Sequence, residues 1–453
     1  MAEQDIGSNP YRELAWRFFI TFLLGVVVYR LGIYIPIPGV SLDALRAMVS
    51  GAGDDSPLGV VLRWANMFNG GAIAQASIFG LGIMPYISAS IIFQLLAFSI
   101  PALKALQKEG ESGRRKINQY TRYATLVIAL VQAAIASVAL ANMPPAQDAM
   151  GRSLPLVTAE YTTAFIIQST LVITTGSMLI LWIAEQITKF GIGNGVSIVI
   201  MIGILASAPA AFQGLPPELP PYLGAIAVAM IIIAAIVIVV QAVRRINLEQ
   251  QRRVQGNRVY GGGQTTLPLK LNQANVIPVI FASPVVIVLS MAVAGLDNLT
   301  GGHLGIAHLL DYGAPLHRYV FAGLIVAFTF FYISITFDLN DLSNHFKQAG
   351  FFVRGIKPGK NTVDHLQWIL TRITVVGATF LALIAILPEL ATAFVSSGPI
   401  ANQGAALLLG GTGLMIVVGV TIDVMQKVST FFLAHQYQGL AGGNAGKKSG
   451  KRF

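Results

Sequence analysis

Long runs of apolar residues alternate with short polar segments along the whole chain. Each run has about the 17–25 residues that a helix needs to cross the hydrocarbon core of a bilayer. The pattern therefore predicts ten membrane-spanning helices, at residues 18–35, 81–100, 122–141, 161–183, 196–213, 222–243, 276–294, 319–337, 368–388 and 404–426.

The lysines and arginines fall almost entirely in every second gap between these runs. That set of gaps carries them at residues 12–17, 104–122, 189, 244–270, 347–360, 427 and 447–452. The opposite set carries only Arg46, Arg63, Arg152 and Arg318, while Arg30 and Arg372 lie inside or beside predicted helices. Because cytoplasmic loops hold the excess of basic residues, the pattern predicts that both termini and the large basic loops are cytoplasmic.

The predicted helices form two groups of five. Because five is odd, the second group begins on the opposite side of the membrane, and two such groups would be related by an axis in the membrane plane, as in many transport proteins. We divide the chain into residues 1–243, with the first five helices and the sixth, a basic loop at 244–275, the remaining helices at 276–438 with a second loop at 338–367, and a tail at 439–453. The tail is rich in Gly, Lys and Ser, and we expect it to be disordered.

Composition supports a membrane protein. The chain has 453 residues, of which 54% are hydrophobic and 11% charged, which is too apolar for a water-soluble globule of this size. The net charge of +10 would suit anionic lipid headgroups, acidic protein surfaces or RNA as partners of the basic loops. No small-residue cleavage site follows the first apolar run, so we expect that run to remain as a helix.

The segment 66–80 is weakly apolar and runs directly into the second predicted span. It is too polar to face lipid, and backbone at that depth is tolerated only inside protein or along an aqueous cavity. We therefore expect a re-entrant half-helix that fills a vestibule. An amphipathic helix on the membrane surface is the alternative.

The predicted spans lack the groups that catalysis would use. All six histidines fall outside them, cysteine is absent, and neither an H-E-x-x-H nor a G-x-S-x-G motif occurs. An ion-coupled transporter usually places acidic side chains near the bilayer midplane, but Glu185, Asp338 and Glu389 lie at predicted helix ends and Asp423 lies near one. The sequence thus predicts neither an enzyme nor a metal or cofactor site, and it leaves a secondary transporter with inverted repeats as the alternative function.

Aliphatic pairs at helical spacing follow glycine or proline breaks in two spans. Ile83 and Ile87 are four residues apart and share a helix face, and Val196 and Ile200 repeat that spacing after Gly191–Gly195. Taken alone, such pairs are typical of ordinary helix packing.

Several uncommon strings occur in order along the chain. They are Ile-Pro-Ile-Pro-Gly at 35–39, the segments 76–79 and 82–90, the basic string at 108–116, Gly-Ile-Gly-Asn-Gly at 191–195, and the segments 267–270, 276–278 and 355–359. Together they resemble the SecY family of protein-conducting channels over essentially the whole chain. The resemblance implies an all-α membrane protein whose ten transmembrane helices form two pseudo-symmetric five-helix halves, a clamshell around an hourglass pore with a re-entrant plug helix.

The resemblance also implies roles for individual residues in closing the pore. The plug would be residues 66–79, including Asn66, Phe68, Asn69, Gly70, Gly71, Ile73 and Ser77. The constriction ring of the pore would be Ile83, Ile87, Val196, Ile200, Ile280 and Ile416. Such an aliphatic collar dewets and blocks ions, yet deforms around a passing polypeptide.

Family members also open sideways into lipid, between helices two and three on one side and helices seven and eight on the other. Ser88, Gln94 and Asn275 are the matching candidates in this lateral gate. An apolar signal or transmembrane helix would leave through the seam, while polar segments of unfolded secretory and membrane protein precursors would continue across.

The two basic loops match those that dock the translating ribosome or the motor ATPase SecA. The candidate contact residues are Arg252, Arg253, Arg258, Arg354 and Lys357. This chain has Asn257 and Lys357 where the family often has arginine, and lysine lacks the planar fork of arginine. The resemblance further implies SecE-like and SecG-like subunits, contact with anionic lipids, and a location in the bacterial cytoplasmic (inner) membrane.

Overall fold

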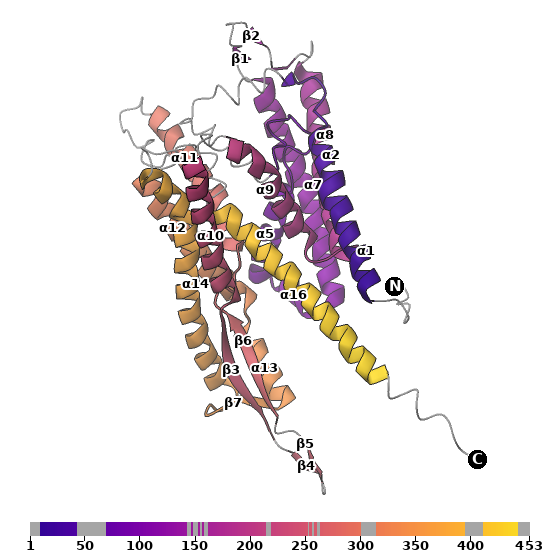
Figure 1. Cartoon of the computed structure of the whole chain (residues 1–453), viewed down its shortest axis with the longest axis vertical. Helices are drawn as coiled ribbons and strands as arrows, with labels where there is room; N and C mark the ends of the chain where they lie inside the picture. Colours follow the sequence, from indigo (N-terminus) through magenta and orange to yellow (C-terminus); the bar gives the residue numbers. More distant parts are fainter. Residues whose placement is uncertain are drawn as a thin grey trace, which may run out of the picture. The chain divides into compact units, whose positions relative to one another are not determined.

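The computed structural model describes residues 10–42, 69–142, 146–147, 153–154, 156–157, 162–213, 219–251, 253–255, 258–260, 263–299, 314–394 and 411–442. Most of these residues are helical (Figure 1). Among them, six helices are long and apolar enough to cross a membrane, and a seventh qualifies if the bent pair Met84–Ala97 and Pro101–Gln107 is one broken span. Shorter apolar helices and α11 take the remaining predicted positions.

The chain divides into two compact units, Met1–Pro209 with Val420–Phe453 and Ala210–Gly419. The first unit contains α1 (Pro10–Phe22), the π-helical segment η1 (Leu23–Val28), α2 (Tyr29–Ile33), α5 (Met84–Ser99), α6 (Pro101–Lys108), α7 (Glu111–Ala141), α8 (Thr162–Phe190) and most of α9 (Gly195–Gln213). A short hairpin of β1 (Ala146–Gln147) and β2 (Ser153–Leu154) joins α7 to α8, and α16 (Gly411–Gly442) is shared between the two units.

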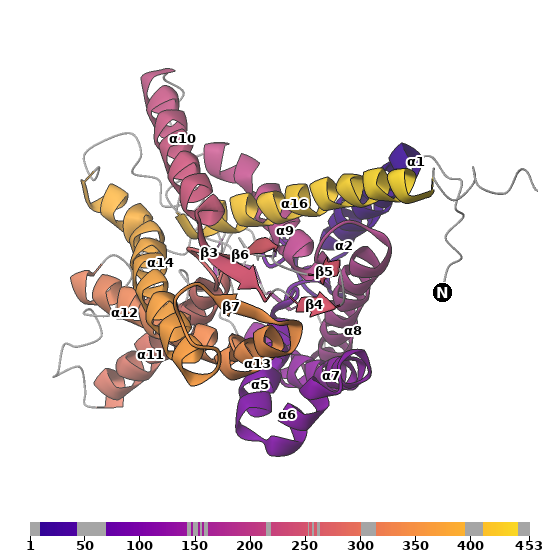
Figure 2. The same ribbon diagram turned by 90° about the horizontal axis from the view of Figure 1, so that it is seen from below.

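A stripe of small residues lets α7 pack closely on α8. Thr121, Thr125, Ala129, Ala133 and Ser137 recur every fourth position and are all buried. The threonine hydroxyls donate to the carbonyl four residues earlier, as Thr125 does to Thr121 at 2.7 Å, so they need no partner on another helix. Small side chains allow two backbones to approach within a membrane, and both views show α7 beside α8 (Figures 1 and 2).

The second unit combines helices with a small sheet. Its helices are α10 (Leu219–Gln241), α11 (Ile277–Leu299), α12 (Pro315–Thr336), α13 (Leu339–Ala349) and α14 (Lys360–Phe394). Its strands are β3 (Val243–Gln250), β4 (Arg253–Gln255), β5 (Arg258–Tyr260), β6 (Gln264–Lys270) and β7 (Phe351–Val353). The sheet has the antiparallel order β6-β3-β7, and β4 pairs with β5 in a separate hairpin.

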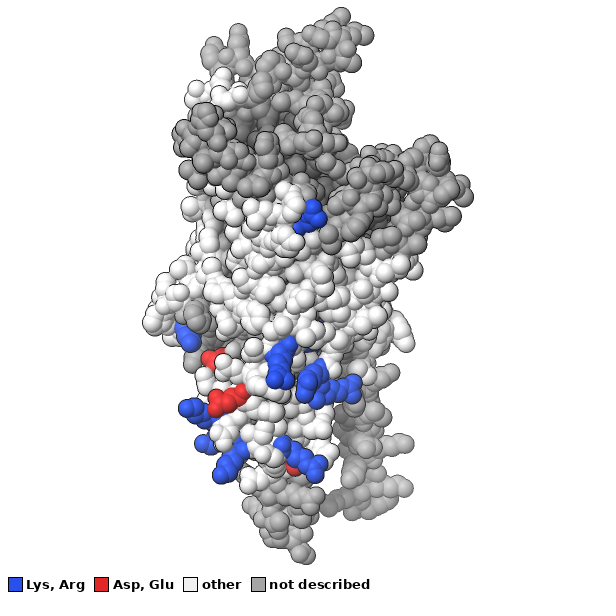
Figure 3. Space-filling view, turned by 90° about the vertical axis from the view of Figure 1, so that its left-hand side faces the viewer, with Lys and Arg blue, Asp and Glu red and all other residues white. Residues whose placement is uncertain are grey.

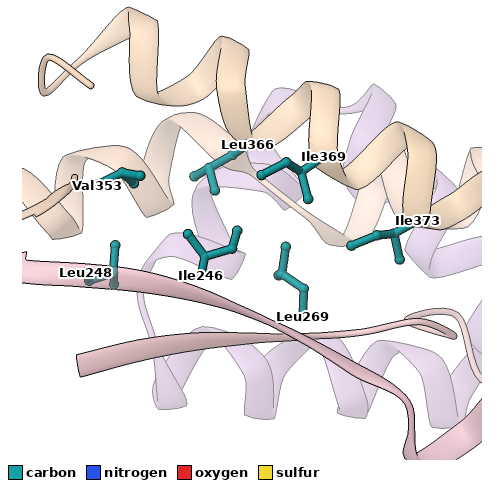
Figure 4. Packing of buried hydrophobic residues seen from close by; sticks show 7 residues of the cluster. All are labelled: Ile246, Leu248, Leu269, Val353, Leu366, Ile369 and Ile373. Atoms are coloured by element: carbon teal, nitrogen blue, oxygen red, sulfur yellow. The ribbon is translucent and has the colours of Figure 1, made fainter. Parts of the chain in front are cut away.

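One face of the sheet packs against α14. Ile246 and Leu248 of β3 are buried, whereas their neighbours Arg245 and Asn247 are exposed, which is the alternation of a half-buried strand. The buried face meets three side chains of α14, and the whole cluster consists of Ile246, Leu248, Leu269, Val353, Leu366, Ile369 and Ile373 (Figure 4). We call it the sheet core. The sequence analysis treated residues 244–275 only as a basic loop and missed this alternation.

Removing a side chain from the sheet core should loosen the sheet. Leu366 is 1% exposed, and replacing a buried leucine by alanine usually costs about 2–5 kcal/mol. We expect Leu366→Ala to reduce the protection of the β3 amides against hydrogen exchange. Leu383→Ala is the matched control, because Leu383 lies on the same helix and is 58% exposed. Equal protection in the two variants would contradict the sheet core described here.

Candidate pore, plug and docking surface

Residues 69–83, the described part of the expected plug and the residues that lead into α5, are held between helices of the first unit. Ala72, Ser77 and Phe79 are each at most 1% exposed. The N–H of Ile37 donates to the carbonyl of Ala76 at 2.7 Å. The segment is thereby fixed to the chain that follows α2, rather than lying on the outer surface of the unit.

The segment consists of turns where a half-helix was expected. Gly70, Gly71 and Gly82 have φ values of 65°, 89° and 56°, and Ala76 has a φ of 44°. A right-handed helix requires negative φ throughout, so these positions interrupt it. The expected plug residues Ile73 and Ser77 lie within these turns, whereas Asn66 and Phe68 lie outside the described residues.

Polar groups of this segment find partners inside the protein. Asn69, which is 4% exposed, donates its Nδ2 to the Gly80 carbonyl at 2.7 Å. The hydroxyl of Ser77 donates to the Gly32 carbonyl at 2.9 Å and accepts the N–H of Phe79. Since a buried polar group without a partner costs free energy, these bonds favour this single conformation.

Arg30 forms the charged contact with the segment. Its Nη1 donates to the carbonyl of Gly70 at 3.1 Å, and its guanidinium lies 5.4 Å from the ring centroid of Tyr34. The sequence analysis identified Arg30 as a cation inside a predicted span but gave it no function. A lone cation in an apolar run was the available signal.

Glycines allow the segment to approach the neighbouring helices. A Cβ on Gly32 of α2 would overlap the ring of Phe79, and a Cβ on Gly176 of α8 would overlap the carbonyl oxygen of Ile78. The Phe79 ring also stacks on Tyr29, with centroids 5.9 Å apart and planes 10° apart. These contacts hold Ile78 and Phe79 closely against α2 and α8, and the sequence analysis missed them.

Four of the six proposed ring residues belong to the first unit. Ile83 directly precedes α5 and Ile87 follows one turn later, while Val196 and Ile200 lie one turn apart on α9. Ile83 and Ile200 are buried, and the other two are half-buried.

The last two proposed ring residues belong to the second unit. Ile280 is half-buried on α11, and Ile416 is 3% exposed on α16. The ring assignment therefore draws on both units and remains a prediction.

A glycine-rich turn sets the direction in which α9 begins. The N–H of Gly195 donates to the hydroxyl of Thr188 at 2.8 Å, and the N–H of Ile192 donates to the hydroxyl of Thr21 at 3.1 Å. A Cβ on Gly195 would overlap the carbonyl oxygen of Ala184. The turn thus ties α8 and α1 to the start of α9, where Val196 and Ile200 lie.

The proposed gate residues lie near helix starts or on exposed helix surface. Ser88 is half-buried on α5, and Gln94 is exposed on the same helix, where its Nε2 donates to Ser90 at 3.3 Å. Asn275 directly precedes α11 in the second unit and has a φ of 51°, a conformation that asparagine tolerates better than most residues. Its carbonyl accepts a bond from the Asn272 Nδ2 at 3.1 Å.

The structure joins the two expected docking loops. β3 lies in the first loop and β7 in the second, and the two strands pair with Leu248 opposite Val353. Arg354 follows β7, and its Nε lies 3.7 Å from the Glu249 carboxylate of β3. We call the sheet β6-β3-β7, together with the turns that flank its strands, the platform.

The platform presents several proposed docking residues. The Arg354 side chain is 79% exposed, and Lys357 is exposed in the turn before α14. Arg253 and Arg258 lie on β4 and β5, respectively, and Arg252 lies outside the described residues. On the face drawn in Figure 3, lysines and arginines gather near one end, whereas the middle is almost free of charge.

The part of the chain that the structure describes contains no candidate metal-binding cluster. No group of three His, Asp or Glu side chains there could hold an ion. Of the carboxylates that the sequence places at or near helix ends, Glu185 pairs with Arg122 and Asp423 with Lys427 at 2.8 Å, whereas Asp338 accepts the N–H groups of Asn340 and Asp341.

Enlarging Gly32 should displace the plug segment. We expect Gly32→Ala to push the Phe79 ring away and to raise the maleimide labelling rate of a cysteine at Ala72 about tenfold, because overpacking typically costs about 1–3 kcal/mol. The chain has no native cysteine, so Ala72→Cys is a clean reporter. Gly323→Ala is the control, since a Cβ there meets open space. Unchanged labelling in Gly32→Ala would show that the contact does not fix the segment.

Comparison with known proteins identifies the family of this chain. A family model described as SecY matches residues 77–425. The protein translocase subunit SecY of Thermotoga maritima is 38% identical over 448 residues, which cover 97% of each chain. "The structure of a protein conducting channel" matches 93% of each chain with a TM-score of 0.59 and 18% identity. Canine Sec61 from a ribosome-channel complex matches 93% of each chain with a TM-score of 0.54 and 16% identity.

These matches confirm the resemblance inferred from the short sequence strings, and with it the fold class of a helical, multi-pass membrane protein. The Thermotoga maritima relative aligns with nearly the whole chain, and both solved structures share the fold of this chain. This chain belongs to the SecY family.

Proposed function

We propose that this chain is the pore-forming subunit of a bacterial protein translocase. It would pass unfolded secretory polypeptides across the cytoplasmic membrane and release apolar helices sideways into lipid. The observation that carries the proposal is the buried, non-helical segment 69–83, which leads directly into Ile83 and Ile87. Irregular backbone within a membrane protein belongs inside protein or along an aqueous cavity, and a stopper beside a pore meets that condition.

The six ring residues would supply the seal without binding substrate. An aliphatic collar offers no hydrogen bond to water or ions, so a narrow one dewets, yet any polypeptide side chain can pass it. Val196 has one methylene group fewer than the isoleucine common in the family, which would make the collar slightly wider at that point. A pore of this kind performs no covalent chemistry, so we propose a channel subunit and not an enzyme.

Sideways release would occur where α5 and α7 separate from α11 and α12. The exposed Gln94 supports this proposal, because the bond that its side chain makes among the described residues is a 3.3 Å contact within α5 that opening would not break. Ser88 and Asn275 would line the same seam. A sufficiently apolar helix gains free energy by moving from there into lipid, whereas a polar segment does not.

The platform would receive the partner that drives transport. Its exposed Arg354 and Lys357, with Arg252, Arg253 and Arg258 nearby in the sequence, suit an RNA or acidic protein surface. A translating ribosome and the ATPase SecA are the proposed partners, with SecE-like and SecG-like subunits and anionic lipids around the channel. By the distribution of basic residues, the platform and both termini would be cytoplasmic.

The alternative of an ion-coupled transporter has no support in these features. Such a transporter needs carboxylates that bind and release a cation near the bilayer midplane. In the described residues, Glu185 and Asp423 are instead each paired with a cation, Arg122 and Lys427 respectively.

A stalled substrate tests the channel directly. We expect a photoreactive residue at Ile87 to crosslink to a secretory precursor arrested midway through the membrane, because Ile87 would line the polypeptide path. The same residue at Val127, which is 61% exposed on α7, should give no such adduct. Absence of the Ile87 adduct, with arrest of the precursor verified, would refute the polypeptide path.

Docking should depend on charge at the platform. We expect Arg258→Glu with Lys357→Glu to weaken binding of SecA or ribosomes roughly tenfold at low salt, and less at high salt, because exposed charges contribute about 0.2–1 kcal/mol each and are screened by ions. The control pair Arg114→Glu with Arg115→Glu changes the net charge equally on α7. Co-sedimentation across a salt series measures the effect, and equal binding by both double variants would exclude the platform as the docking site.

A further inference from the structure

Arg372 is a cation inside an apolar span. It lies on α14, whose residues Lys360–Leu387 are long and apolar enough to cross a membrane, and it is the only charged residue between Ile369 and Leu387. A charge at such a place needs a counter-charge or a route to water. Arg30, another cation within a span, has the Gly70 carbonyl as its partner.

The charge of Arg372 has no counter-charge among the residues that the structure describes. None of the ion pairs among the described residues involves it, and Asp364, the carboxylate closest to it in sequence, forms no pair with it. Its guanidinium instead lies over the ring of Trp368, 3.8 Å from the centroid. The charge therefore remains open to a partner outside the chain.

The Trp368 ring is shared by a second aromatic group. The ring of His365 stacks on it with centroids 6.3 Å apart and planes 16° apart. Residues three and four apart lie on one helix face, so His365, Trp368 and Arg372 form a single stack along α14. Leu366, Ile369 and Ile373 occupy a different face and pack in the sheet core (Figure 4). The stack thus turns away from the core, and Trp368 is 50% exposed.

The geometry is that of a side chain at a membrane interface. Arg372 extends back along α14 by one turn, about 6 Å, to reach Trp368, which stands at the start of the apolar run. Tryptophan is enriched at the membrane–water interface, and arginine near a helix end extends its charge toward it. Beyond Arg372, the exposed Val375, Val376 and Leu383 continue an apolar surface into the span.

We propose that Trp368 and Arg372 bind the phosphate of a membrane phospholipid headgroup at the start of the apolar run of α14. The guanidinium carbon lies over the ring while Arg372 remains exposed, so its N–H groups would be available to a pair of phosphate oxygens. The apolar surface of Val375, Val376 and Leu383 would receive the acyl chains. A free phosphate ion would make no use of this surface, which is why a lipid is the occupant.

The test uses Trp368 as its own reporter. In the full-length protein with Trp16, Trp64 and Trp182 replaced by phenylalanine, Trp368 fluorescence is followed while short-chain phosphatidylglycerol is added in detergent. We expect saturable binding, with the half-saturation concentration raised about tenfold by Arg372→Gln, the effect of losing about 1.4 kcal/mol. Arg372→Lys keeps the charge but lacks the planar guanidinium, so it should give an intermediate half-saturation concentration. This variant also controls for misfolding of Arg372→Gln.

Two control experiments show whether the phosphate comes from a lipid and whether the loss of binding is specific to Arg372. Inorganic phosphate at the same concentrations should leave Trp368 fluorescence unchanged. Arg245→Gln should bind lipid like the parent, because Arg245 neighbours the buried Ile246 on β3 and its side chain points to the opposite side of the sheet from α14. Equal half-saturation in the parent and Arg372→Gln, or an equal response to inorganic phosphate, would overturn the proposal.

Discussion

The hydrocarbon core of a membrane offers no water to backbone polar groups, and the arrangement of the first unit depends on this constraint. Helices satisfy their own N–H and C=O groups, but turns satisfy only some of theirs. The segment 69–83 makes some bonds within itself, as the N–H of Ser77 does to the Ala72 carbonyl at 2.9 Å, and takes others from elsewhere in the protein: the Ala76 carbonyl accepts from Ile37, and the Gly70 carbonyl accepts from Arg30. A segment held by a limited set of such bonds can be rigid in one state and still separable as a unit.

The platform solves a different problem, which is how to keep long polar loops in one shape outside the membrane. Pairing of β3 with β7 connects loops that are far apart in sequence, and the sheet core attaches both to α14. Burial of aliphatic side chains supplies the stabilisation, so the exposed cations need not contribute to folding. Arg354 and Lys357 are then displayed on a defined surface, and a force applied there would be transmitted into a membrane-spanning helix.

Two arginines within apolar spans illustrate two ways to place a charge in a membrane protein. Arg30 satisfies a carbonyl of an irregular segment, so its charge serves internal structure. Arg372 lies against Trp368 on an exposed face, so its charge is directed to the surroundings. The apolar patterns around the two residues are alike in the sequence, and the difference comes from what the fold brings next to each one.

The sequence by itself determined the positions of the helices, the division of charge between the loops, the segment that would act as the plug, and the family. These follow from local periodicity and from strings of neighbouring residues, which need no knowledge of distant contacts. Only the tertiary structure decided that 69–83 forms turns, that β7 completes a sheet with β3, and that Arg30 bonds to Gly70. Each of these depends on residues far apart in the chain, whose pairing is set by packing and hydrogen bonding in three dimensions.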